Sequence, residues 1–103
     1  MDNKYGKFLP IGTVVLLKGA KKRLMITGFC SYDLADKTKA YDYTGCLYPE
    51  GIITSKETAL FNHNQIEKIY FLGYSDQEEK NFKVKLIQEL KKLLQQQQNN
   101  TNK

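Results

Sequence analysis

The sequence changes character once, near Tyr74, and this change limits what the chain can fold into. Residues 1–74 are rich in β-branched and aromatic side chains, which form short apolar runs between turn residues. This pattern is typical of β-strands. Residues 75–103 contain no glycine, no proline and a single aromatic residue, Phe82, which favours a helix. At 103 residues, the chain has room for one small β domain over residues 1–74 and one helical appendage.

Five short strands are predicted in the β domain, at residues 13–17, 23–31, 39–48, 59–61 and 67–73. Gly28 interrupts the second of these runs, which suggests a β-bulge or a sharp bend. Strict alternation along this run would place Leu24 and Ile26 on one face of the strand and Phe29 on the other. Residues 62–65 are expected to form a tight turn, because asparagine favours turn geometry.

Five strands in so short a stretch are typical of a small five-stranded antiparallel SH3-like barrel. A strongly curved open sheet is the alternative. Closure is attractive because it removes exposed sheet edges, which can pair with other chains. In either case we expect a mainly β fold followed by one C-terminal α-helix, which is an α+β architecture.

An amphipathic helix is predicted over residues 75–96. Ser75 and Glu78 have the spacing of a capping box, in which each side chain bonds the backbone N–H of the other residue. The apolar stripe of this helix consists of Phe82, Leu86, Leu90, Leu93 and Leu94. The Gln/Asn-rich residues 97–103 are expected to form a disordered tail.

The far end of this apolar stripe is a first candidate binding surface. The predicted helix would measure roughly 30 Å, which exceeds the width of so small a barrel. Its first two turns are expected to pack on the barrel, whereas Leu90, Leu93 and Leu94 would extend beyond it and contact a protein partner. A homodimer through the helix and a helical partner are two ways to cover these side chains. Packing of the whole stripe on the barrel is the alternative.

The third predicted strand and its end form a second candidate surface, with Tyr41, Tyr43, Tyr48 and Glu50. In SH3-like barrels, aromatic side chains near loops can form a groove for peptides. Tyrosine is also common in ordinary strands. Packing of these tyrosines in the core and at its rim is therefore the alternative that we favour.

A basic group follows the first predicted strand and consists of Lys18, Lys21, Lys22 and Arg23. Together with a net charge of +5, it raises the alternative of a nucleic-acid-binding barrel. Acidic residues elsewhere dilute the charge, however, and the chain contains one arginine, the residue best suited to phosphate and base recognition. We therefore favour a solvated hairpin tip.

The sequence contains no recognisable catalytic, cofactor-binding or metal-binding motif. Its one histidine, His63, and its two cysteines, Cys30 and Cys46, match no metal-ligand or base–nucleophile spacing. We predict that the chain is not an enzyme and uses no cofactor, and that both thiols pack as small hydrophobes.

No apolar run approaches the roughly 20 residues of a membrane span, and no secretory signal is recognisable at the N-terminus. We expect a cytoplasmic location, with export alongside a partner left open.

Several linked motifs occur in order between residues 9 and 82, and they lie at residues 9–19, 24–26, 41–51, 61–66 and 69–74. Their combination resembles the small bacterial family called domain of unknown function 4176. Such proteins occur in Gram-positive bacteria near type VII secretion loci, among LXG toxins and small helical accessory proteins. The resemblance implies a non-enzymatic accessory, adaptor or chaperone-like role, with a toxin or its targeting proteins as partners. An immunity protein that blocks a toxin is a further alternative.

Overall fold

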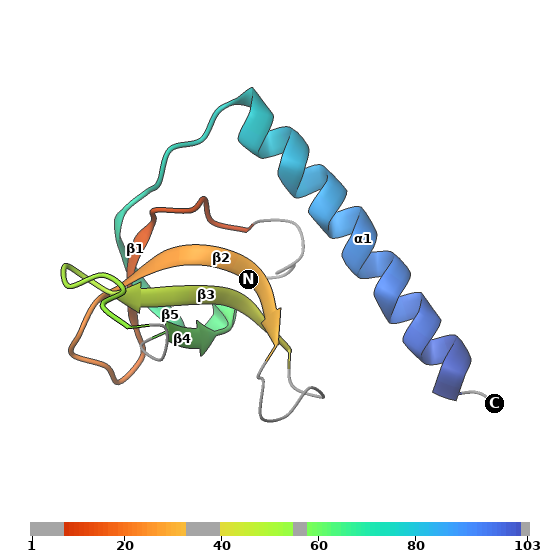
Figure 1. Cartoon of the computed structure of the whole chain (residues 1–103), viewed down its shortest axis with the longest axis horizontal. Helices are drawn as coiled ribbons and strands as arrows, with labels where there is room; N and C mark the ends of the chain where they lie inside the picture. The colour runs from red at the N-terminus through yellow and green to blue at the C-terminus, as the bar shows by residue number, and fades with distance from the viewer. Residues whose placement is uncertain (1–7, 33–39, 55–57, 102–103) are drawn as a thin grey trace.

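The structure is a computed structural model that describes residues 8–32, 40–54 and 58–101, with residues 31–32 and 93–101 described by their backbone alone. It contains five strands, one short 3₁₀ helix (η1) and one α-helix (Figure 1). In chain order these are β1 Val14–Leu17, β2 Leu24–Tyr32, β3 Ala40–Leu47, β4 Thr58–Phe61, η1 His63–Gln65, β5 Ile66–Phe71 and α1 Gln77–Thr101. The five predicted strands are therefore confirmed, and the predicted tight turn is η1.

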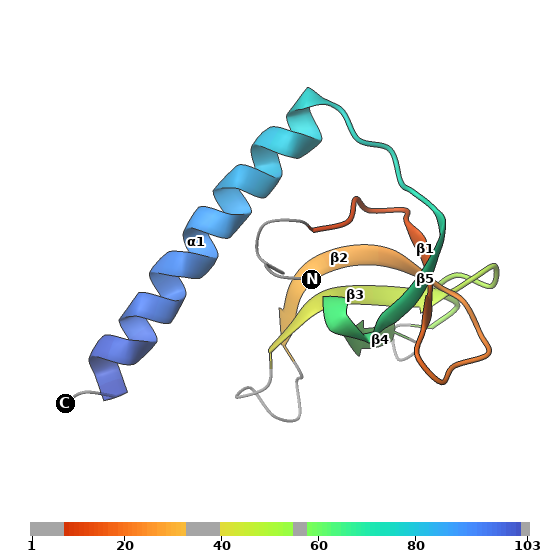
Figure 2. The ribbon, with the colours of Figure 1, turned by 180° about the vertical axis from the view of Figure 1, so that it is seen from behind.

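The five strands form one antiparallel sheet in the order β4-β3-β2-β1-β5. The two edge strands, β4 and β5, are joined by only residues 62–65, so the sheet must curl until the end of one meets the start of the other (Figures 1 and 2). Within the described residues no ladder joins β4 to β5. The sheet is therefore open and strongly curved, and the closed barrel was wrong. η1 lies between β4 and β5 where a hairpin turn would otherwise bring the two strands side by side.

Both sheet edges are unsuited to pairing with another strand. β4 is four residues long, and the register of β5 against β1 shifts twice. β5 also carries the charged residues Glu67 and Lys68. Short edges, bulges and charged side chains are the devices that prevent edge-to-edge pairing. Pairing of another strand with either edge is therefore unfavourable.

The bulge predicted at Gly28 is confirmed, because the register of β2 against β3 shifts between Ile26 and Gly28. The shift also corrects the predicted faces of β2. An extra residue in one strand reverses the alternation beyond it, so Phe29 lies on the core side with Ile26. There the Phe29 ring packs against Phe8 and Tyr43, with ring centroids 5.8 and 6.2 Å apart.

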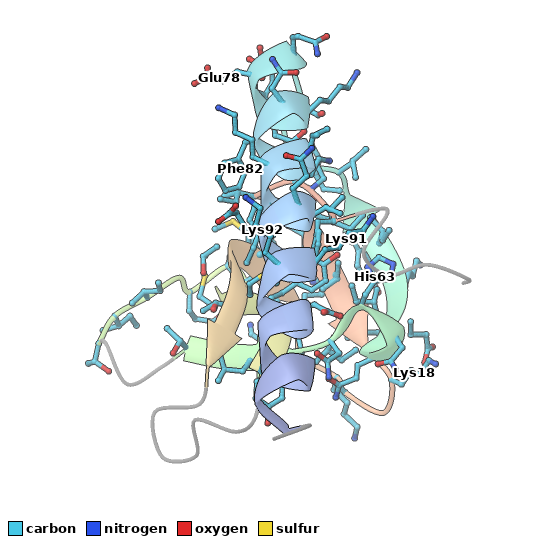
Figure 3. The ribbon with its side chains drawn as sticks, turned by 90° about the vertical axis from the view of Figure 1, so that its right-hand side faces the viewer. Lys18, His63, Glu78, Phe82, Lys91 and Lys92 are labelled. Carbon is cyan, nitrogen blue, oxygen red and sulfur yellow. The ribbon has the colours of Figure 1, made fainter. Side chains whose placement is uncertain are left out.

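The core lies in the concave side of the curved sheet. Its buried side chains are Phe8, Val15, Leu24, Ile26, Tyr43 and Phe61. α1 lies across the open side of the sheet (Figures 1 and 3), where Leu86, Ile87 and Leu90 pack against this core. The stripe predicted for the helix thus covers the sheet at least as far as Leu90.

Asp76, and not Ser75, caps α1. The Asp76 Oδ1 atom accepts the backbone N–H of Glu79 at 2.9 Å, while the Ser75 hydroxyl donates to the Glu79 carboxylate at 2.6 Å. The predicted capping box was therefore one residue too early. Aspartate caps helices as well as serine does, and the Glu79 side chain occupies the Ser75 hydroxyl.

α1 continues to Thr101, so the expectation of a disordered tail from residue 97 differs from the structure. Glutamine is a good helix former, and neither glycine nor proline interrupts this stretch, so nothing local ends the helix at residue 96. Residues 102–103 lie outside the described part of the chain. None of the described helical residues forms a helix both long and apolar enough to cross a membrane.

Candidate binding groove

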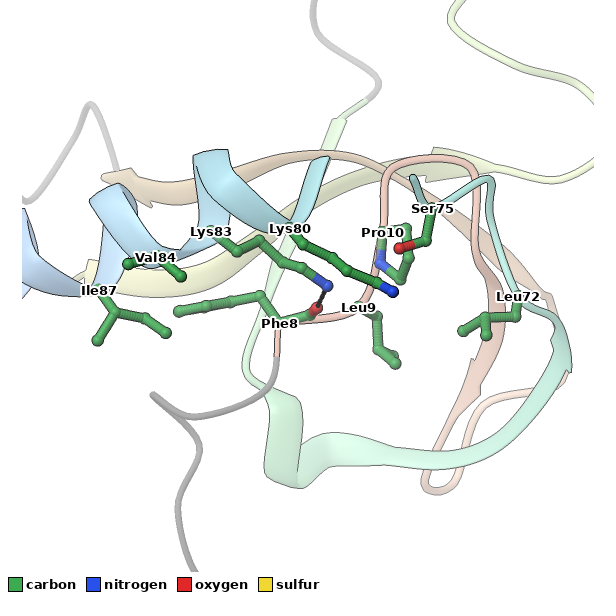
Figure 4. Close-up of a pocket in the computed structure, with 9 residues that line it drawn as sticks. All are labelled: Phe8, Leu9, Pro10, Leu72, Ser75, Lys80, Lys83, Val84 and Ile87. Carbon is green, nitrogen blue, oxygen red and sulfur yellow. Dashed lines mark hydrogen bonds between the residues drawn. The ribbon is translucent and has the colours of Figure 1, made fainter. Parts of the chain in front are cut away.

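An apolar groove of about 380 Å³ lies beside the start of α1 (Figure 4). Two parts of the chain that are distant in the sequence form its walls: residues 8–10 on one side, and on the other the linker after β5 (residues 72–76) together with the first three turns of α1. The lining residues are Phe8, Leu9, Pro10, Leu72, Ser75, Lys80, Lys83, Val84 and Ile87. The lining is apolar apart from one hydroxyl and two lysines.

Gly73 fixes the linker wall of the groove. Its buried backbone N–H donates to the Thr13 hydroxyl at 2.9 Å. The linker crosses the backbone of Ile11 and Thr13 so closely that a Cβ at position 73 would lie 2.9 Å from the Thr13 nitrogen. This crossing holds Leu72 and Ser75 at the rim of the groove (Figure 4).

Lys83 joins the helix wall to the N-terminal wall. Its ammonium group donates to the Phe8 carbonyl at 3.0 Å and lies 3.0 Å from the Glu79 Oε2 atom (Figure 4). The contact with Glu79 is an ion pair without hydrogen-bond geometry. A buried backbone carbonyl is costly to leave unpaired, so the hydrogen bond from Lys83 to the Phe8 carbonyl stabilises the packing of α1 against residues 8–10.

The groove leaves large apolar side chains exposed. Leu72 and Val84 are each 56% exposed, and Phe82 on the same helix is 51% exposed. Lys80 runs across the groove beside Lys83 (Figure 4), and no ion pair joins Lys80 to any other described residue. An apolar groove with a cation at its rim can hold apolar side chains that have a carboxylate nearby.

The Tyr43 hydroxyl positions Leu9, which lines the groove, from behind. It accepts the Leu9 N–H at 3.0 Å and lies 2.7 Å from His63 Nδ1. Because a backbone N–H can only donate, the hydroxyl hydrogen is free to donate to His63, whose Nδ1 atom then carries no proton. The backbone N–H of His63 donates to the Asp42 carboxylate at 2.8 Å. These hydrogen bonds connect η1 and β3 to residues 8–10.

The same network has little capacity for catalysis. Burial raises the pKa of Tyr43 to about 12, so this hydroxyl stays protonated at neutral pH. Asp42 meets His63 through the backbone N–H and not through the imidazole. Within the described residues, no group of three His, Cys, Asp or Glu side chains is placed to hold a metal ion. The geometry therefore indicates a structural role for His63.

The network predicts a pH dependence of folding stability. Burial lowers the pKa of His63 below its usual value of 6.5, although the nearby Asp42 carboxylate opposes this shift. The unfolded chain therefore takes up the proton first as the pH falls, which favours unfolding. The stabilisation is complete above pH 6.5 and is lost as the pH falls through the lowered value.

This dependence can be measured by urea unfolding between about pH 7 and about pH 5. The variant His63→Gln, which does not titrate, should lose less stability than the wild type over this range. Equal losses in both proteins would contradict the assignment, because the carboxyl groups common to both would then explain the whole effect.

The structure separates the residues predicted for the aromatic surface. Tyr43 is fully buried, so its place among the partner-binding candidates was wrong and its place in the core is confirmed. Tyr41 is half-buried, whereas Tyr48 and Glu50 are exposed in the turn after β3. Burial of Tyr43 follows from the register of β3, which turns this ring toward Phe61, with ring centroids 5.4 Å apart.

Two members of the predicted basic group have partners within the chain. Lys22 forms an ion pair with Glu50 at 2.7 Å, and the Arg23 guanidinium lies 5.1 Å from the centre of the Tyr48 ring. Arg23 also lies 5.4 Å from the Tyr70 ring. The ion pair with Glu50 therefore neutralises the charge of Lys22, whereas the two rings hold the Arg23 guanidinium in place without changing its charge.

The leucines predicted for an intermolecular surface have different outcomes. Leu90 is half-buried and packs against the core, so the helix lies along the sheet here and does not leave it after two turns; a role of Leu90 in partner binding stays a prediction. The side chains of Leu93 and Leu94 lie outside the described part of the structure. Of the two cysteines, Cys46 is buried and Cys30 is half-buried, both as free thiols.

The groove residues Leu72, Lys80 and Val84 were missed by the sequence analysis. Val84 carried a usable signal, because it is an apolar residue that lies off the stripe of Phe82, Leu86 and Leu90. Apolar residues outside the buried stripe of a helix often mark a second contact surface.

A second depression of about 400 Å³ lies on the η1 side of the molecule, where Figure 3 shows Lys18 and His63. Its charged lining residues, Lys18 and Glu67, have opposite signs. This depression therefore has no charge preference that would select a ligand.

The family model described as domain of unknown function (DUF4176) matches residues 8–82. The chain belongs to this family. The DUF4176 region contains all five strands, the linker and the first turn of α1, and thus two of the three groove walls. No curated protein and no solved structure matches the chain.

Proposed function

We propose that this DUF4176 protein is a non-enzymatic accessory, adaptor or chaperone-like protein of a Gram-positive type VII secretion locus. Its partner is an LXG toxin or one of the small helical targeting proteins encoded with it. The partner docks in the groove between residues 8–10, the linker and α1. The resemblance of the sequence motifs supports the biological setting of this proposal, and a cytoplasmic location is part of the proposal.

One observation supports a binding role more than any other: the groove combines exposed apolar side chains with a rigid backbone. Leu72 and Val84 each leave more than half of their surface in water. The Gly73–Thr13 and Lys83–Phe8 hydrogen bonds hold the walls in place. A preformed apolar groove costs little conformational entropy on binding.

Co-expression of the tagged chain with the LXG toxin and the helical proteins of its own locus tests this proposal. We expect at least one of them to co-purify. The variant Val84→Glu should lower the affinity for that partner by about tenfold or more, because binding would bury a carboxylate against apolar side chains.

Ile53→Glu is the matched control, because it also replaces an exposed β-branched apolar side chain with glutamate, at a position that is 73% exposed and lies outside the groove. It should leave recovery of the partner unchanged. Failure of every locus protein to co-purify would contradict the proposed function. Equal recovery with both variants would exclude the groove as the docking site.

Light scattering of the purified chain tests the alternative that a second copy of the chain occupies the groove. It would then detect a homodimer.

A further inference from the structure

We infer that the groove binds an amphipathic helix that carries two carboxylates about three turns apart, one on each side of an apolar pair. This inference rests on the proposed function, since it names the chemistry of the partner at the same site. It follows from the pattern of side chains on α1, the unpaired charges there and the unsuitable sheet edges.

The exposed groove side of α1 has a symmetrical pattern. Lys80, Val84, Ile87 and Lys91 are spaced by four, three and four residues, so they lie on one face of the helix. The two apolar members line the groove, and a lysine lies at each end of the set. The two lysines are separated by roughly 16 Å along the helix axis.

Most of the lysines on this part of α1 have no ion-pair partner within the described residues. Residues 80–92 contain five lysines and one glutamate. Glu89 pairs with Lys92 at 3.4 Å, and Lys83 pairs with Glu79, whereas no ion pair within the described residues involves Lys80 or Lys91. Figure 3 shows Lys91 and Lys92 on opposite flanks of the helix. An anionic partner would therefore meet two unpaired ammonium groups.

The partner segment is expected to be a helix rather than a strand. The edges β4 and β5 are short or bulged, so strand addition is unfavourable. A helix laid antiparallel against α1 presents side chains at the same spacing of four, three and four. Glutamates at its ends would then face Lys80 and Lys91, and two apolar residues would face Val84 and Ile87.

A synthetic peptide of about 18 residues in an alanine–glutamine background tests this inference. It carries a glutamate, a leucine four residues on, a second leucine three residues later and a second glutamate four residues after that. Two control peptides replace both glutamates with lysine or both leucines with glutamine. Binding to the full chain is measured by titration of its backbone amide NMR signals.

We expect the glutamate peptide to shift the amide signals of residues 72–75 and 80–91, and neither control peptide to do so. The double variant Lys80→Glu plus Lys91→Glu should bind the glutamate peptide about threefold to tenfold more weakly and should now bind the lysine peptide. Both positions are exposed, so the variant keeps the fold. The affinity should fall as the salt concentration rises.

Absence of shifts at these residues, or equal binding of the glutamate and lysine peptides, would overturn the inference. If a locus protein co-purifies but the glutamate peptide does not bind, the proposed function stands and the inferred partner chemistry is wrong. If the glutamate peptide binds but no locus protein co-purifies, the inferred chemistry stands and the secretion role is wrong.

Discussion

Replacing Phe61 with alanine is expected to lower the free energy of unfolding by about 3–5 kcal/mol, the cost of removing a buried phenylalanine. Phe61 is fully buried at the end of β4, and its ring lies 5.4 Å from that of Tyr43. The ring edge also fills the space above Gly45, which has no side chain to close a cavity left there. Urea unfolding followed by circular dichroism measures the change.

Phe71→Ala is the matched control for this prediction. It removes the same side chain from β5, the strand at the opposite edge of the sheet, but Phe71 is 63% exposed. The free energy of unfolding should change by less than about 1 kcal/mol. A similar loss of folding stability in both variants would contradict the prediction, because it would mean that Phe61 contributes no more to the core than the exposed Phe71.

The second large effect is expected for Gly73→Ala, with a loss of about 2–3 kcal/mol in the free energy of unfolding. The new Cβ would lie 2.9 Å from the Thr13 nitrogen and still closer to the Ile11 carbonyl oxygen. Both are backbone atoms, so no side chain can rotate to relieve the contact. The linker would have to move, which would also weaken the hydrogen bond from Gly73 to Thr13.

Gly28→Ala serves as the control for Gly73→Ala. A Cβ at position 28 would meet its nearest neighbour, the Thr44 Cβ, at 3.7 Å, an ordinary contact distance. Stability should therefore change by less than about 1 kcal/mol. If Gly73→Ala lowered the free energy of unfolding as little as Gly28→Ala does, the close crossing over Ile11 and Thr13 would not hold the linker. The groove would then lack a fixed wall.

The strands and the helix could be predicted because their signals are local. The β-branched run at Val14 and the turn residues around each strand are sufficient to place β1 to β5. The open form of the sheet could not be predicted, because it depends on how β4 and β5 meet across η1. The face of Phe29 was wrong because one extra residue at the bulge reverses every later position in β2.

The groove could not be predicted from the sequence, because residues 8–10 form one side of it and residues 72–87, more than 60 positions away, form the other. Nothing in the sequence near Leu9 indicates that Leu72 and Val84 lie beside it. Burial is also a tertiary property: Tyr43 and Tyr48 are similar in the sequence, but one is fully buried and the other is 36% exposed. The local sequence pattern therefore predicts the strands and the helix. The groove that forms between them can be identified only from the structure.

Hydrogen exchange of the chain alone and in complex with its co-purified partner tests the central claim most directly. The claim is that a partner docks in the groove formed by residues 8–10, the linker and α1. We predict slower exchange on binding in residues 72–76 and 80–87, with no change in β3 and β4. Protection at the turn that holds Tyr48 and Glu50, with none in the linker, would contradict it.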